Sequence, residues 1–239
     1  MTGGLVVDSE IAANWRNRHQ SFGHGVSMEG GRLLRCRIAG NHSGANTSEV
    51  AGCGIHADSR ERRCVIENCA VVSNGVHGVC LINGGTMRNT LVAGHANTSI
   101  ELFYNASRVS NAGVYATGAA LVNCTIVDNI SGGDHADLWH DSASGSVVNT
   151  IAESAAVSAA TASCNLLGAD PGFKARAKGD YRPAFGSPAI DAGDNTPWAG
   201  VADATDLAGN PRIVPRRDGV VDIGCYEALT PAATLLIVQ

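Results

Sequence analysis

The sequence predicts an all-β protein: a right-handed parallel β-helix, or solenoid, of about six coils with a less regular C-terminal β cap. Three observations lead to this fold class. One motif recurs in register through the first two-thirds of the chain, at steps of 27, 33, 21, 34 and 26 residues. Each copy contains two short, β-branched strand signals bounded by Gly, Asn, Asp or Ser. No helical period of useful length separates them, so equivalent strands of successive copies are expected to pair, as they do in a solenoid.

Four columns of equivalent residues define the repeat. An apolar column contains Val6, Leu33, Ile66, Met87, Leu121 and Val147. A column of small residues contains Ser9, Cys36, Cys69, Thr90, Cys124 and Thr150. A branched apolar column contains Ile11, Ile38, Val71, Val92, Ile126 and Ala152. A fourth column contains Asn14, Asn41, Asn74, His95 and Asn129, and it fails at Ala155. Because side chains two residues apart share one face of a strand, we expect the apolar and small columns to point into the coil.

The asparagine column supports the stack independently of the hydrophobic pattern. Asparagine tolerates left-handed backbone in turns, and stacked asparagine side chains can hydrogen-bond as a ladder. Asn89, Asn123 and Asn149 precede the small-residue column and predict a partial second ladder. Parallel crossovers are right-handed in nearly all proteins, which favours a right-handed coil.

The composition fits a narrow core with glycine at its corners. Charged residues make up 16% of the 239 residues, below the roughly 25% of typical soluble domains. Of the eight cysteines, Cys36, Cys69 and Cys124 share one column, which favours buried thiols. A Cys36–Cys69 disulfide is the alternative, because neighbouring parallel strands lie about 4.8 Å apart.

Several classes of partner are disfavoured. A net charge of −5 without a basic stripe argues against nucleic acid. No run approaches the roughly 20 apolar residues of a membrane span, so the chain is not expected to cross a membrane. The first residues contain no signal peptide. Met1 already aligns with Met28 inside a repeat, so we expect the natural protein to extend upstream.

The pattern changes after about residue 158, which divides the chain into coils (1–158) and a C-terminal coil and cap segment (159–239). Five motifs follow in order: DPGF at 170–173, GDYR at 179–182, SPAIDAG at 187–193, DLAGNPR at 206–212 and DIGCYE at 222–227. This set resembles the C-terminal segment of bacterial right-handed parallel β-helix repeat proteins of the "choice-of-anchor Q" group. Gly172, Pro183 and Cys225 depart from that group's pattern. The resemblance implies a secreted or cell-surface bacterial protein without a defined activity, and it transfers no catalytic residues.

The densest cluster of titratable groups gives the candidate catalytic residues. They are Asp134, His135, Asp137, His140 and Asp141. A loop that gathered them could bind a metal or perform acid–base chemistry, with Trp139 as a platform for a sugar ring. The alternative is a solvated turn, because residues 137–139 occupy the position of a strand start in other coils. The segment 22–27 also resembles the GHG segment of polygalacturonases, but the paired aspartates and the Arg-x-Lys of those enzymes do not follow.

Two further groups are candidate metal sites. His24, Cys53 and His77 each stand just before a glycine in successive coils, where soft ligands could gather. A turn position that tolerates polar residues is the more common explanation of such a column. The C-terminal acids are Asp191, Asp194, Asp203, Asp206, Asp218 and Asp222. They leave calcium open as a cofactor, although turn-forming aspartates are the simpler explanation. No other cofactor is expected.

Two functions remain. The leading hypothesis is a secreted or cell-surface scaffold without defined catalytic activity, which binds polysaccharide or another cell-surface partner through variable loops at about 42–52, 96–111 and 130–144. Insertions in a solenoid often lie on its binding face. The alternative is a polysaccharide-active enzyme, a pectate lyase-like protein or a glycoside hydrolase, with its site on the coil face around residues 134–141.

Overall fold

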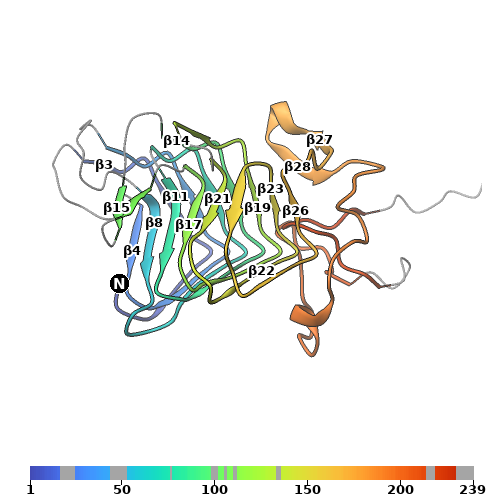
Figure 1. The fold of residues 1–239 in the computed structure, drawn as a ribbon, viewed down its shortest axis with the longest axis horizontal. Helices are drawn as coiled ribbons and strands as arrows, with labels where there is room; N and C mark the ends of the chain where they lie inside the picture. The colour runs from blue at the N-terminus through green and yellow to red at the C-terminus, as the bar shows by residue number, and fades with distance from the viewer. Residues whose placement is uncertain are drawn as a thin grey trace, which may run out of the picture.

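The protein is a parallel β-helix, as the sequence predicts. The computed structural model describes residues 1–16, 25–43, 53–75, 77–97, 102–104, 107–109, 112–132, 136–213 and 219–229. Three long parallel sheets enclose one narrow core, and the chain visits them in the same order in each coil (Figure 1). Within the described residues, no helix has the length and apolar character that a membrane crossing requires.

The strands of the three sheets are listed here in their spatial order. The first sheet consists of β1 (Leu5–Val7), β5 (Gly31–Leu34), β9 (Cys64–Glu67), β12 (Thr86–Arg88), β18 (Ala120–Val122), β22 (Ser146–Val148) and β25 (Thr161–Ser163). The second consists of β2 (Glu10–Ala12), β6 (Arg37–Ala39), β10 (Ala70–Val72), β13 (Leu91–Ala93), β19 (Thr125–Val127), β23 (Ile151–Ala152) and β26 (Leu166–Leu167). The third consists of β4 (Val26–Met28), β8 (Cys53–Asp58), β11 (His77–Ile82), β17 (Val114–Ala116), β21 (Leu138–His140) and β24 (Ala155–Val157).

Short elements complete the fold. Two parallel pairs extend the second sheet's side: β3 (Trp15–Arg16) with β7 (His42–Ser43), and β14 (Ala96–Asn97) with β20 (Ile130–Ser131). Two antiparallel pairs are β15 (Leu102–Tyr104) with β16 (Ser107–Val109), and β27 (Phe173–Ala175) with β28 (Asp180–Pro183). The 3₁₀ turns η1 (Arg176–Lys178) and η2 (Thr196–Trp198) lie in the C-terminal segment.

Strand register confirms the two apolar columns. Val6 pairs with Leu33, and the same alignment continues to Val147. The branched column pairs in the same way, from Ile11 to Ala152. The stack then continues one coil beyond the six predicted, through β25 and β26, where Ala162 pairs with Val147. The buried members of both columns belong to the main core cluster.

The corner between the first and second sheets is the short corner, because each of its seven turns has two residues. The first turn residue always has a left-handed backbone, with φ between 48° and 53° at Asp8, Arg35, Asn68, Asn89, Asn123, Asn149 and Cys164. Asparagine and aspartate tolerate this conformation better than other non-glycine residues. In the first six turns the second residue comes from the small-residue column, whose members Cys36, Cys69 and Cys124 point into the core.

The corner between the second and third sheets is the variable corner. Between two and twenty residues separate a strand of the second sheet from the next strand of the third. The third corner, between the third and first sheets, has only two to five residues and many glycines with positive φ. Two predicted loops, 42–52 and 96–111, therefore start from the variable corner, although most of their residues lie outside the described part. The third predicted loop, 130–144, is divided by β21 between two corners.

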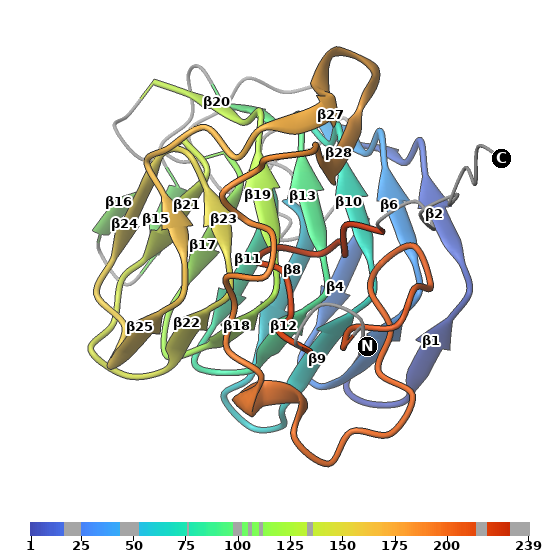
Figure 2. The same ribbon diagram turned by 90° about the vertical axis from the view of Figure 1, so that its right-hand side faces the viewer.

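The C-terminal segment lies along the side of the solenoid. The sequence predicts a cap over the open end, but hydrogen bonds connect this segment to Asn89, Asn123 and Asn149 in three successive coils. Figure 2 shows the orange and red ribbon crossing in front of the first and second sheets. The reason is chemical: left-handed asparagines project polar side chains from the short corner, and these offer the segment hydrogen-bond partners.

Candidate functional site

The asparagine ladder lies inside the variable corner. The Oδ1 atom of Asn41 accepts hydrogen bonds from the main-chain N and the Nδ2 of Asn14, at 3.1 and 2.8 Å. The Oδ1 atom of Asn74 accepts the corresponding two hydrogen bonds from Asn41. His95 continues the ladder, because its Nδ1 accepts the main-chain N–H of Asn74 at 3.1 Å. Burial lowers the pKa of His95 to about 4, so the ring is neutral and acts as an asparagine substitute.

Asp137 is the last member of the ladder, which sequence comparison of the coils misses. Its Oδ1 accepts the main-chain N–H and the Nδ2 of Asn129, at 3.2 and 2.9 Å. Its Oδ2 accepts the main-chain N–H of Ser154 at 3.0 Å. Burial raises the pKa of this carboxyl group above its ordinary value. Because these contacts lie inside the coil wall, the carboxylate of Asp137 positions the backbone and does not face a ligand.

Of the five candidate catalytic residues, the structure describes Asp137, His140 and Asp141, and these three do not gather at one place. Asp134 and His135 lie outside the described residues. His140 is buried at the end of β21, and its Nε2 lies 3.0 Å from the carbonyl oxygen of Ala119. Asp141 is exposed at the corner between the third and first sheets, and its N–H bonds to Ala116. Asp137 and Asp141 thus stand at opposite ends of one strand.

Of the three residues in the candidate metal column, the structure describes Cys53 and His77. His24 lies outside the described residues. Cys53 and His77 are register partners on β8 and β11, and both are buried. The sulfur of Cys53 lies 3.0 Å from the sulfur of Cys80. Among the described residues, no group of three or more His, Cys, Asp and Glu side chains could hold a metal ion.

An exposed aromatic pair lies in the described part of the variable corner. Trp15 and His42 follow the first two ladder residues, on the paired strands β3 and β7. Their ring centroids lie 6.5 Å apart at 46°, and Trp15 is 69% exposed. In the next coil the equivalent residue is Gly75, where a Cβ would lie 3.1 Å from Nδ1 of His42. The missing side chain leaves room for the His42 ring.

A second aromatic pair lies on the outer side of the third sheet. Tyr115 and Trp139 are register partners, with ring centroids 5.8 Å apart at 81°. Tyr115 is buried, which raises the pKa of its hydroxyl to about 12, while Trp139 is half-buried. In both views the β15–β16 hairpin lies outside the stack, on this side of the molecule (Figures 1 and 2). Trp139 is therefore less open to a sugar ring than Trp15.

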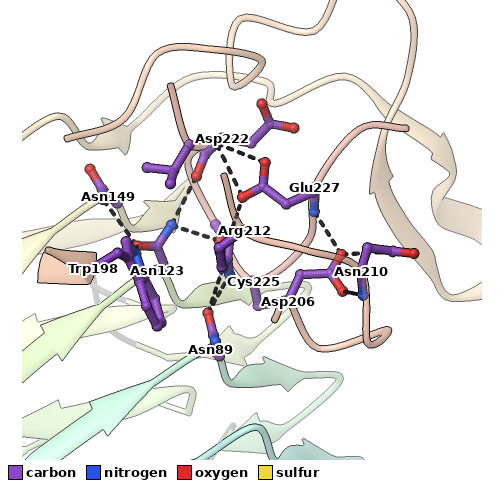
Figure 3. Close-up of polar contacts among 12 residues, drawn as sticks. Asn89, Asn123, Asn149, Trp198, Asp206, Asn210, Arg212, Asp222, Cys225 and Glu227 are labelled. Carbon is purple, nitrogen blue, oxygen red and sulfur yellow. Dashed lines mark hydrogen bonds and ion pairs between the residues drawn. The ribbon is translucent and has the colours of Figure 1, made fainter. Parts of the chain in front are cut away.

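A polar network joins the C-terminal segment to the short corner, as Figure 3 shows. Arg212 is fully buried, and its Nη1 donates to Oε1 of Glu227 at 2.7 Å. Its Nε donates to Oδ1 of Asn89 at 2.9 Å, and its guanidinium lies 5.4 Å from the ring centre of Trp198. Trp198 in turn donates from Nε1 to Asn123 at 2.8 Å. Burial raises the pKa of Glu227 to about 8, even beside this arginine.

The acidic side chains near this network accept hydrogen bonds from backbone N–H groups. Asp206 Oδ1 accepts the N–H groups of Ala208 and Asn210, the arrangement of an aspartate turn. Asp222 Oδ1 accepts the N–H of Asp191, which fixes the SPAIDAG motif. Asp194 likewise accepts the N–H of Thr196. Asp218 lies outside the described residues. The turn explanation of the C-terminal acids therefore holds for Asp194 and Asp206.

Fold and site together define a β-helix with one variable, aromatic-bearing corner and one corner closed by its own C-terminal segment. No family model, no curated protein and no solved structure matches the chain.

Proposed function

We propose that the protein is a bacterial secreted or cell-surface scaffold that binds a glycan along its variable corner. The observation that carries this proposal is the exposed Trp15–His42 pair, at the corner where connection lengths vary most. An open aromatic face offers apolar contact, and an imidazole can donate or accept a hydrogen bond. A sugar ring needs both kinds of contact.

The exposed row along this corner suits an extended ligand. Trp15, His42, Ala96 and Ile130 each follow a ladder residue, and all four are exposed. They are stacked along the solenoid, with coils about 4.8 Å apart. The ladder beneath them keeps their backbone fixed, so a polymer lying along the coil axis would meet a preformed surface. Preformed surfaces lose less conformational entropy on binding.

Location and origin rest on the sequence resemblance. The five C-terminal motifs resemble those of bacterial surface proteins, and the parallel β-helix architecture agrees with that resemblance. The described C-terminal network gives the motifs a structural purpose, since the DLAGNPR and DIGCYE segments supply Arg212 and Glu227. A scaffold role needs no further chemistry from them.

The enzyme alternative has weaker support. It requires two carboxylates from neighbouring coils that face one groove, with a basic group nearby. Asp137 is engaged in the ladder, and Asp141 lies at another corner. Asp128 and Glu153 do come from neighbouring coils, but Arg176 of the C-terminal segment binds both carboxylates. The exposed acids Asp8 and Glu10 form ion pairs with Arg35 and Arg37.

Glycan binding by the purified full chain tests the proposal. On an array of bacterial and plant polysaccharides, we expect binding that Trp15→Ala weakens at least tenfold and that His42→Ala weakens less. Phe185→Ala is the matched control, because Phe185 is a fully exposed aromatic residue in the C-terminal segment. Equal losses for Trp15→Ala and Phe185→Ala, or no binding to any glycan, would refute the proposal.

A parallel assay addresses the enzyme. The same polysaccharides, pectins included, are incubated with the protein with and without calcium, and reducing ends and unsaturated uronates are measured. We expect no product above background. Product release would refute the scaffold proposal and support the enzyme alternative.

A further inference from the structure

Cys53 and Cys80 are a pair of buried cysteines whose sulfur atoms are in contact. Cys53 begins β8 and Cys80 lies in β11, the adjacent strand of the third sheet. Their exposed fractions are 1% and 0%, and their sulfurs lie 3.0 Å apart. Both belong to a small cluster on the outer side of the sheet, with Ile82 and Tyr115.

A local break in strand alternation brings them together. Regular alternation would place Cys53 and Cys80 on opposite sides, because Cys80 pairs with His56, three residues after Cys53. Gly54 interrupts this pattern: a Cβ at Gly54 would lie 2.6 Å from Nδ2 of Asn74, inside the coil. The next residue, Ile55, also points into the core. Two successive inward positions turn Cys53 to the outer side, where it meets Cys80.

The column cysteines make different contacts. The thiols of Cys36, Cys69 and Cys124 each lie within 3.5 Å of the carbonyl oxygen two residues earlier. They behave as small core residues with a backbone acceptor. The sulfur of Cys53 instead contacts another sulfur, and no third metal-binding side chain joins the pair in the part of the chain that the structure describes. These contacts favour a sulfur–sulfur bond over a metal.

We propose that Cys53 and Cys80 form an inter-coil disulfide, with a low-molecular-weight disulfide as the oxidant. One cysteine loses its proton, and its thiolate attacks a sulfur of the small disulfide, which releases one small thiol. The second cysteine, also deprotonated, attacks the protein sulfur of this mixed disulfide and releases the second small thiol. The protein thus loses two electrons and two protons, and the reagent becomes two thiols.

Burial determines when this reaction occurs. Contact with Cys53 and desolvation raise the pKa of the Cys80 thiol well above its ordinary value, and both sulfurs are shielded from solvent. A buried thiol reacts slowly. The bond therefore forms while the chain folds or when this part of the coil opens, and afterwards the same burial protects it from reductants. The extracellular location proposed above supplies the oxidising compartment, whereas the pairing itself follows from the geometry.

Thiol counting in a defined redox buffer tests the pairing without reference to glycans. The full chain is refolded in glutathione buffers from fully reduced to fully oxidised, quenched in acid, alkylated under denaturing conditions and mapped by mass spectrometry. We expect two of the eight cysteines to become unreactive, joined as a Cys53–Cys80 peptide pair. We also expect the oxidised protein to unfold at least tenfold more slowly than the reduced protein.

Variants give the controls. Cys53→Ser and Cys80→Ser should each abolish the loss of two thiols, while Cys164→Ser, which changes the exposed cysteine, should retain it. Eight reactive thiols after oxidation, or a cross-link between other cysteines, would overturn the proposal. If a variant does not fold, the peptide map of the unaltered chain still decides. A glycan-binding protein with eight free thiols would refute this inference and leave the proposed function intact.

Discussion

Arg212 donates from Nε to Oδ1 of Asn89 over 2.9 Å, across 123 residues of sequence. The bond joins a fully buried guanidinium in the C-terminal segment to a left-handed turn of the short corner. Nη1 of the same guanidinium donates to Oε1 of Glu227 at 2.7 Å. One side chain thus connects the last motif of the chain to a coil in the middle of the stack.

Replacing Arg212 by methionine should therefore strongly destabilise the folded protein. The change leaves the acceptors of Asn89, Glu227 and Gly224 buried without their donor. Each such group costs about 1–3 kcal/mol, so we expect the free energy of unfolding to fall by about 3–5 kcal/mol. Urea denaturation followed by circular dichroism measures it. Arg37→Met is the matched control, because Arg37 forms an exposed pair with Glu10, and such pairs contribute about 1 kcal/mol or less. Similar losses for both variants would show that the network does not hold the segment.

His95→Asn should make the protein less sensitive to acid. The folded-state pKa of His95 is about 4, below the ordinary 6.5, so the folded protein binds fewer protons than the unfolded chain between these values. Stability from the neutral ring is present above pH 6.5 and is lost as pH falls through 4. Between pH 7 and 5 this amounts to about 2 kcal/mol.

Denaturation midpoints at both pH values check this prediction. Asparagine is the ladder's usual residue and does not titrate, so the drop should shrink in His95→Asn. His42→Asn, at an exposed position, should keep the drop of the unaltered chain. An unchanged drop in His95→Asn would contradict the assigned role of the ring.

Asp137→Ala should destabilise the coil wall. Its oxygens accept three N–H groups from Asn129 and Ser154, and each buried donor left without a partner costs about 1–3 kcal/mol. We expect a total loss of about 3 kcal/mol, measured by urea denaturation. The exposed Asp141→Ala should change stability by about 0.5 kcal/mol or less. If Asp137→Ala retained full stability, the carboxylate would be free for another role.

Gly113→Ala should overpack the variable corner. A Cβ there would collide with the carbonyl oxygen of Asp137 and would lie 2.8 Å from Nδ2 of Asn129. Overpacking of a closely packed interior costs about 1–3 kcal/mol. Gly75→Ala is the control, since a Cβ there would lie no closer than 3.1 Å to any neighbour, the nearest being Nδ1 of the exposed His42. Thermal unfolding should separate the two variants by several degrees, and equal melting temperatures would be inconsistent with the ladder packing.

The ladder illustrates how far the sequence could go. Asn14 to Asn129 follow the repeat, so their stacking could be predicted, and His95 could be placed by alignment alone. The last member of the ladder, Asp137, could not be predicted in this way. Asp137 stands only eight residues after Asn129, at the far end of the ten-residue connection from β19 to β21, where a titratable cluster suggests chemistry. The left-handed backbone was assigned to the ladder asparagines, whereas it belongs to the short-corner residues such as Asn89.

The sequence by itself determined the coil: a repeat of apolar, small and asparagine positions can bury its side chains and satisfy its backbone only by stacking on copies of itself. These requirements are local and recur in each copy, so spacing is enough to reveal them. Only the tertiary structure decided where the C-terminal segment lies and which polar residues face each other across it. Arg212, Asn89 and Glu227 share no period, and Cys53 meets Cys80 because one glycine shifts the alternation of a strand. Such contacts depend on the packing of distant segments, which no local pattern encodes.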